Sequence, residues 1–254
     1  MVTDLQKASL LKRIAAGIFD MILLCTLAVG FAWLLAALLN YNGCNAALEQ
    51  EYARYESLYG VEFDISQEAY QELSQQQQQT YDTAYQALIS DEAVLRSYNL
   101  LINLSLVITT FGILLAVLAL EFVVPLFLKN GQTLGKKIFG IGLIRTDGVQ
   151  MNNLQLFTRT VLGKFTIEIM IPVYILMLIF FNSIGVVGIT ILGMLLLAQI
   201  ILPAATQTHS LIHDLLAGTV AVDLSSQIVF RSTEDLIAYK KKIHAEQVSR
   251  SDYQ

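Results

Sequence analysis

The sequence predicts an all-α membrane protein: a four-transmembrane-helix bundle with an extracytoplasmic helical insertion and a small cytoplasmic strand pair. Composition is the first reason. Of the 254 residues, 55% are hydrophobic and only 15% are charged, whereas soluble domains average about 25% charged residues. The second reason is that the apolar residues are gathered in runs of about 20 or more, the length that crosses the hydrocarbon core of a bilayer.

Four segments are long and apolar enough to cross a membrane: 14–39, 100–127, 158–181 and 184–203. The first exceeds the roughly 7–15 apolar residues of a signal peptide, so we expect an uncleaved span. Only Asn182 and Ser183 separate the last two segments, which predicts a tight helical hairpin.

The distribution of basic residues predicts the orientation. Lysines and arginines gather before the first span, between the second and third, and after the fourth, whereas 41–98 has only Arg54 and Arg96 against ten acidic residues. Because basic residues are enriched in cytoplasmic loops, both termini are predicted to be cytoplasmic. The predicted parts are the N-terminus with the first span, the extracytoplasmic insertion, the remaining spans with their cytoplasmic loop, and a cytoplasmic C-terminal helix: 1–40, 41–98, 99–224 and 225–254.

Local signals predict two helices within the insertion at 41–98. Residues 46–59 have a helical pattern that Gly60 ends, since glycine readily takes the left-handed conformation that follows a helix. Ser66 is a suitable N-cap for a second helix that runs toward Ser90. The simplest interpretation is a helical cap with a solvated acidic face. The alternatives are a vestibule that gathers cations and a surface that binds an extracytoplasmic protein partner.

Two short segments predict the cytoplasmic strand pair. Residues 138–145 are followed by the turn pair Asp147-Gly148, and residues 219–223 form a second extended candidate. After them, 233–247 is predicted to be a surface helix, because acidic residues occupy its first turn and lysines follow, as the helix dipole favours.

Charged residues at the inner ends of the spans are the main candidates for a functional site. Such groups are unfavourable in a bilayer core unless they are paired or hydrated. Arg13 and Asp20 lie two helical turns apart on one helix face, about 10 Å from each other, and Asp214 is the expected partner of Arg13. The triad is interpreted either as an ion or proton site or as a structural ion-pair network.

Two acidic residues lie inside the predicted second and third spans. Lys164 precedes Glu168 by four residues, the spacing at which it would neutralise Glu168 on one helix face. Glu121 has no partner nearby in the sequence, so it is either a further ion or proton site or an interfacial residue. His213 is expected to hydrogen bond to Asp214 or to titrate near neutral pH.

A glycine-rich segment lies between the second and third spans and contains Gly131, Gly135 and Lys136. It does not have the glycine–lysine spacing of a P-loop. We expect a tight turn whose glycines permit close backbone contact and whose lysines lie at the level of anionic lipid headgroups.

The sequence gives no positive sign of catalysis. A catalytic triad and a nucleotide-binding loop are missing, and two histidines one helical turn apart, His209 and His213, are a weak metal motif. A basic stripe for nucleic acid is also missing. We therefore expect no enzymatic activity, no cofactor, no bound metal and no nucleic-acid partner, and we expect membrane lipids as partners.

Three motifs resemble the RDD family of integral membrane proteins, which is named for one arginine and two aspartates. In chain order they occupy 12–20, 131–148 and 213–219. The first enters a span, the second is similar to the family's central loop, and the third is similar to its closing His-Asp motif. The resemblance covers about 10–40 and 100–223 and identifies the namesake residues as Arg13, Asp20 and Asp214.

The resemblance implies a bacterial plasma (inner) membrane and, for some members, exchange of a monovalent cation for protons. We therefore expect small-solute or cation transport in which Asp20 and Asp214 bind the cation or proton and Arg13 competes for them. Four helices leave little room for a pathway, so a homo-oligomer is expected. One alternative is a non-transporting scaffold or accessory subunit whose triad is a structural clamp. Another is a lipid-modifying or lipid-sensing role, which the basic Lys136-Lys137 loop suggests. Family members often carry arginine just before the His-Asp pair, where this chain has Thr208-His209-Ser210.

Overall fold

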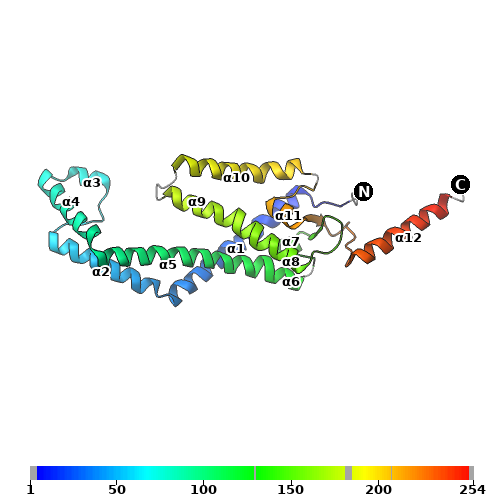
Figure 1. Cartoon of the computed structure of the whole chain (residues 1–254), viewed down its shortest axis with the longest axis horizontal. Helices are drawn as coiled ribbons and strands as arrows, with labels where there is room; N and C mark the ends of the chain where they lie inside the picture. Colours follow the sequence, from blue (N-terminus) through cyan, green and yellow to red (C-terminus); the bar gives the residue numbers. More distant parts are fainter. Residues whose placement is uncertain (1–4, 129, 181–184, 207, 252–254) are drawn as a thin grey trace. The chain divides into compact units, whose positions relative to one another are not determined.

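A computed structural model of the chain describes residues 5–128, 130–180, 185–206 and 208–251. These residues are mainly helical and contain one two-stranded sheet (Figure 1), which confirms the predicted fold class. The chain divides into two compact units, one formed by Met1–Ala28 with Leu114–Gln254 and the other by Val29–Ile113. The long helices α1 (Leu10–Leu38) and α5 (Glu92–Val117) contribute residues to both units.

The described residues contain four helices with the length and hydropathy of membrane spans: Leu10–Leu38, Glu92–Leu128, Asn153–Ile179 and Gly185–Ala205. They coincide with the four predicted segments, and the chain is therefore a multi-pass membrane protein. Large apolar side chains point outward from them, as Trp33 and Val186 do with 74% and 79% exposure. Apolar surface of this extent is typical of a membrane contact. The predicted turn at Asn182 and Ser183 lies outside the described residues.

Two of the spans contain π-helical segments. The second span consists of α5, the π-helical segment η1 (Leu118–Val123) and α6 (Val124–Leu128). The third consists of α8 (Asn153–Phe157), the π-helical segment η2 (Thr158–Met170) and α9 (Ile171–Phe180), and α10 (Gly185–Ala205) is the fourth. The two π-helical segments are in contact, and the Thr160 hydroxyl donates to the Glu121 carbonyl at 2.9 Å. Because π-helices are rare and are frequent at functional sites, the contact between η1 and η2 locates a candidate site.

The predicted strand pair is present. Strand β1 (Ile141–Arg145) pairs with β2 (Thr219–Asp223) in antiparallel register over their full length. The first strand is shorter than predicted, because residues up to 138 form the helix α7 (Leu134–Ile138). Thr133 caps α7, and Gly140, with a φ of 66°, turns the chain into the strand. Helix α11 (Ile212–Ala217) precedes β2, and α12 (Thr233–Ser251) includes the whole predicted C-terminal helix.

The residues before α1 fasten the sheet to the first span. The backbone N–H of Ala8 donates to the Ala221 carbonyl at 3.2 Å, and that of Asp223 donates to the Gln6 carbonyl at 2.9 Å. The Lys12 Nζ atom then lies 2.7 Å from Asp223 Oδ2. The start of the first span is thus bound to the end of β2.

The second unit contains α2 (Tyr41–Tyr59), α3 (Gln67–Glu72) and α4 (Gln75–Ser90). Gly60 ends α2 with a φ of 62°, as predicted. Ser66 caps the next helix, also as predicted. That helix does not continue to residue 90, because Leu73 is extended and Ser74 starts α4 with a capping box to Gln77. The prediction of a single helix from Ser66 toward Ser90 was therefore wrong, because the segment forms two helices.

Aromatic rings and one carboxylate hold the second unit together. The ring centroid of Phe63 lies 6.0 Å from that of Tyr52 and 5.7 Å from that of Tyr81, both in edge-on contact. Asp91 accepts hydrogen bonds from Tyr55 at 2.8 Å and from Arg54 at 3.1 Å. The helices of the insertion therefore have a small core of their own.

We predict that the Lys12–Asp223 pair makes stability depend on pH. Hydrogen bonds from Lys12 and then Ser225 lower the pKa of Asp223 to about 2, from an ordinary value of about 3.9. A carboxyl group with a lower pKa in the folded state stabilises the fold above about pH 4, and this contribution is lost as the pH falls toward 2. The unfolding temperature in detergent should therefore fall less between about pH 4 and pH 2 in Asp223→Asn than in the parent.

A matched change on the other side of the pair is Lys12→Gln, which removes the donor and keeps the carboxyl group. It should weaken the same acid dependence. If both variants lose stability with acid as steeply as the parent does, the pair has no such role.

Candidate functional site

Asp20 is held by the loop that follows the second span. Its Oδ1 atom accepts a hydrogen bond from the Gly135 N–H at 2.8 Å, and its Oδ2 accepts one from the Thr133 hydroxyl at 2.5 Å. The Lys136 Nζ atom lies 3.7 Å from Oδ2. Asp20 is buried, with 6% of its surface exposed. Its carboxylate joins the first span to the start of α7 through these hydrogen bonds.

Two glycines allow the loop to approach so closely. A Cβ atom at Gly135 would lie 2.5 Å from the Ala16 carbonyl oxygen and 2.9 Å from Asp20 Oδ1. Gly131 has a φ of 61°, and a Cβ there would lie 2.7 Å from the Met151 methyl group. The structure thus uses both glycines for close approach, as their pattern in the sequence indicates.

Glu121 lies among three basic side chains. Lys164 of η2 hydrogen bonds to Oε1, while Arg159 Nη1 and Lys136 Nζ lie 3.8 and 3.9 Å from Oε2. The predicted pairing of Lys164 with Glu168 is wrong. In a π-helix residue i bonds to residue i+5, so residues four apart no longer lie one above the other, and Lys164 points to η1 instead.

Asp214 is paired with two guanidinium groups. Arg159 donates through Nε to Oδ1 at 2.9 Å, and Arg13 Nη2 lies 3.7 Å from Oδ2. The Thr219 hydroxyl donates to Oδ1 at 3.2 Å. The predicted contact between Arg13 and Asp214 is present, but Arg159 is the hydrogen-bonded partner. Arg13 donates through Nη1 to the His209 carbonyl at 2.6 Å.

His213 lies between Asp214 and Glu168. Its Nδ1 atom is 2.7 Å from Glu168 Oε2, and its backbone N–H donates to Oε1 at 3.1 Å. Burial and the positive charge of Arg159 lower the pKa of His213, which favours the neutral imidazole. A neutral ring with its proton on Nδ1 would donate to the Glu168 carboxylate. Its Nε2 atom is 3.6 Å from Asp214 Oδ1. The two residues are therefore neighbours, as predicted, but this distance is too long for the predicted hydrogen bond.

Asp214 stays ionised in this setting. Burial alone would raise its pKa, but the positive charge and hydrogen bond of Arg159, with help from Arg13, hold the pKa below its usual value. A carboxylate that accepts a hydrogen bond from a guanidinium group is a strong pair because the bond is charge-assisted.

These residues form one buried ionic network, and all of them belong to the first unit. Four basic side chains meet four carboxylates and one neutral imidazole: Arg13, Lys136, Arg159 and Lys164; Asp20, Glu121, Asp214 and Glu168; and His213. The formal charges cancel, so the network as a whole does not attract a free ion. Among the fully buried members, removal of Glu121, Arg159 or Asp214 would leave an uncompensated buried charge, which is strongly destabilising.

One gap interrupts the network. Within the described part of the chain, Glu121 Oε2 and Arg159 Nη1 are buried without a hydrogen-bond partner, although they lie only 3.8 Å apart. A buried donor and acceptor in this state require an explanation. The gap is the one place in the network where a proton or a small polar guest would gain contacts that the protein does not already supply.

Helix α11 reaches the network because η2 carries a glycine at the contact. A Cβ atom at Gly163 would lie 2.6 Å from His213 Cβ and 2.7 Å from its Cα. Neither Gly163 nor Arg159 is among the predicted site residues, although Arg159 was counted with the basic residues that flank the spans. The sequence did contain a signal for Arg159, because a charged residue inside the predicted apolar span at 158–181 indicates a paired or functional group. An isolated glycine in a membrane span gives no such signal.

The sequence profile of the RDD family matches residues 7–218. The chain belongs to the RDD family. The uncharacterized protein YckC of Bacillus subtilis (strain 168) is 30% identical to it over 105 residues, which cover 41% of this chain and 55% of that protein. The chain therefore aligns with about half the length of this relative. No solved structure matches the chain.

The namesake residues of this RDD protein lie in one network, but not as a closed triad. Asp20 is bound by the α7 loop, and Arg13 and Asp214 approach each other from α1 and α11. At 208–210 this chain has no arginine before the His-Asp pair. The guanidinium group that binds Asp214 most directly comes instead from Arg159 of η2.

We predict that Arg159 stabilises the protein more than the namesake Arg13 does. Arg159→Met would leave both Asp214 and Glu121 short of a partner, and removal of one partner of a buried pair costs about 3–5 kcal/mol. Arg13→Met should have a smaller effect, because Arg159 still binds Asp214. The measurement is the free energy of unfolding of each variant in the same detergent. An Arg13→Met loss equal to or larger than that of Arg159→Met would contradict this ranking.

Proposed function

We propose that this RDD protein is a non-transporting membrane scaffold or accessory subunit in which the buried ionic network acts as a structural clamp. The observation that carries the proposal is that the two namesake aspartates are already bound by the protein itself. Asp20 is bound by two donors of the α7 loop and Asp214 by two guanidinium groups. A cation that bound to either aspartate would have to displace these donors, which are part of the protein and stay close to the carboxylates.

The clamp would fix the ends of three spans to the strand pair and to α11. We place this assembly on the cytoplasmic side of a bacterial inner membrane, with both termini there. The support is the abundance of basic residues in the segments that flank the sheet, set against the acidic composition of 41–98, because cytoplasmic loops are enriched in lysine and arginine. The acidic second unit would then face outward as the surface for a protein partner.

A second candidate function is exchange of a monovalent cation or small solute for protons. The gap between Glu121 Oε2 and Arg159 Nη1 favours it. So does Lys136, because burial lowers its pKa against the opposing effect of Glu121. If Lys136 lost its proton, Asp20 and Glu121 would be left with excess negative charge, which a monovalent cation could neutralise. This function would require a pathway, which we would expect at contacts in a homo-oligomer.

One experiment separates the two functions. The full chain is reconstituted in liposomes that enclose a pH-sensitive dye, and proton movement is followed after addition of Na⁺ or K⁺. Unfolding temperatures are measured in parallel for the parent, Asp20→Asn and Asp214→Asn. The clamp predicts proton movement no faster than in empty liposomes, and unfolding temperatures several degrees lower for both variants, because each change leaves buried basic groups unpaired.

The matched control is Asp147→Asn, which removes an exposed carboxylate paired with Arg145. An exposed pair contributes little to stability, so this variant should unfold like the parent. Cation-dependent proton movement by the parent that is lost in Lys136→Met, in a variant that still reconstitutes as a folded protein, would establish exchange and contradict the clamp.

A further inference from the structure

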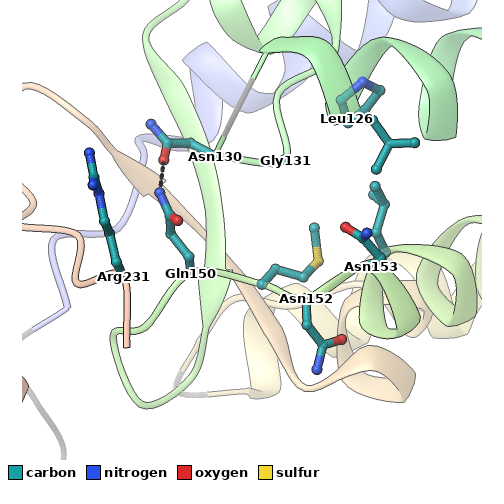
Figure 2. A pocket seen from close by; sticks show the side chains of 10 residues that line it. Leu126, Asn130, Gly131, Gln150, Asn152, Asn153 and Arg231 are labelled. Carbon is teal, nitrogen blue, oxygen red and sulfur yellow. Dashed lines mark hydrogen bonds between the residues drawn. The ribbon is translucent and has the colours of Figure 1, made fainter. Parts of the chain in front are cut away.

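A polar cavity of about 410 Å³ lies where the second span ends and the third begins. In Figure 2, Leu126 of α6 and Asn153 of α8 lie on one side of it, and Arg231 lies on the other. Asn130 and Gln150 lie between them and are hydrogen bonded to each other. The cavity belongs to the first unit and contains no member of the buried ionic network.

The charge of the cavity is positive. Among the described residues that line it, Arg231 is the one charged side chain, and four others carry carboxamides: Asn130, Gln150, Asn152 and Asn153. No carboxylate is present among these residues, and Arg231 forms no ion pair with any described residue. Arg231 is exposed, and a guanidinium group that lines a pocket of neutral amides without a counter-charge favours an anionic ligand over a cation.

The amide groups supply further donors. Gln150 donates through Nε2 to Asn130 Oδ1 at 2.9 Å, and the backbone N–H of Gln155 donates to Asn152 Oδ1 at 2.7 Å. With these oxygens engaged, Asn130 and Asn152 keep their NH₂ groups for other partners. Figure 2 shows the Asn130 amide nitrogen turned toward the side on which Arg231 lies. An anion with several acceptor oxygens is the matching ligand.

The other side of the cavity is apolar and lies at the end of two membrane spans. Pro125 and Leu126 belong to the last turns of the second span, and Leu156 belongs to the first turn of the third. The boundary between hydrocarbon and headgroups lies near the ends of spanning helices. A ligand in the cavity would therefore place an anionic group beside Arg231 and carbon atoms beside these side chains.

The backbone around the cavity is held in place. Asn130 and Gly131 both have left-handed conformations, with φ of 50° and 61°, and the Leu143 N–H donates to the Asn130 carbonyl at 2.9 Å. The Gln150 N–H donates to the Phe230 carbonyl at 2.8 Å, which fixes the residue before Arg231. The backbone that carries these side chains is thus held in place by the protein's own hydrogen bonds.

We propose that this cavity binds a phosphate ester that carries neighbouring hydroxyl groups. An anionic glycerophospholipid headgroup and soluble glycerol phosphate share this chemistry. Arg231 binds the phosphate, the amides of Asn130 and Asn152 bind ester and hydroxyl oxygens, and the apolar side contacts the glycerol carbons or the first atoms of the acyl chains. Lys136, the residue that the sequence places at headgroup level, is instead buried in the ionic network, so Arg231 takes that role.

The test is a calorimetric titration of the full chain in non-ionic detergent. The probes are dihexanoyl phosphatidylglycerol, dihexanoyl phosphatidylcholine and sn-glycerol 3-phosphate. We expect saturable binding of at least one of the two glycerol phosphate probes, with phosphatidylcholine bound more weakly. Binding of phosphatidylglycerol alone identifies a lipid as the natural source, whereas equal binding of glycerol 3-phosphate identifies a soluble phosphate ester.

Two variants locate the binding. Arg231→Gln should weaken it by about tenfold or more, because a hydrogen bond to a charged group is lost. Asn130→Asp should abolish it while the protein stays folded, since the new carboxylate can still accept the hydrogen bond from Gln150. Lys240→Gln is the matched control, because it removes one exposed positive charge from α12 outside the cavity.

The proposal is overturned if neither glycerol phosphate probe binds, or if phosphatidylcholine binds as tightly as they do. It is also overturned if Lys240→Gln weakens binding as much as Arg231→Gln, since the attraction would then come from the general positive charge of this end of the chain.

Discussion

The pairing of Arg159 with carboxylates from two other elements is the constraint on which the first unit depends. The guanidinium group is buried, donates to Asp214 of α11 at 2.9 Å, and lies 3.8 Å from Glu121 of η1. A buried guanidinium group is stable only when carboxylates reach it, so η1, η2 and α11 must pack as they do. Lys136 then connects Glu121 to Asp20, and the first span is drawn into the same network.

The π-helical segments make this pairing possible. They change the spacing of side chains along the second and third spans, so that Lys164 faces Glu121 and Glu168 is left for His213. The network is balanced in formal charge, and among its described atoms Glu121 Oε2 and Arg159 Nη1 are the buried ones without a hydrogen-bond partner. A site of this kind stabilises one arrangement of helices, and it has to lose a proton or break a pair before it can accept an ion. These properties favour a clamp and define what an exchanger would have to do.

Hydropathy and capping signals predicted most of the fold, because each depends on residues close together in the sequence. The four spans, the end of α2 at Gly60 and the cap at Ser66 are examples. Ion-pair partners that lie far apart in the sequence were harder to predict. The spacing rule for an ordinary α-helix misassigned Lys164, and Arg159 was counted with the flanking basic residues although it lies inside a predicted span. The break at Leu73 was missed because Ser74 is as good a helix cap as Ser66, and the glutamines after it form helix in either case.

The most direct test of the central claim is a double-mutant cycle on Arg159 and Asp214, with unfolding free energies measured in detergent for Arg159→Met, Asp214→Leu and the combined variant. Replacement of a whole buried pair by apolar residues is often close to neutral, whereas loss of one partner is not. We predict that the combined variant is more stable than either single variant. Losses that simply add would show that these two side chains do not depend on each other, and the clamp would have to be abandoned.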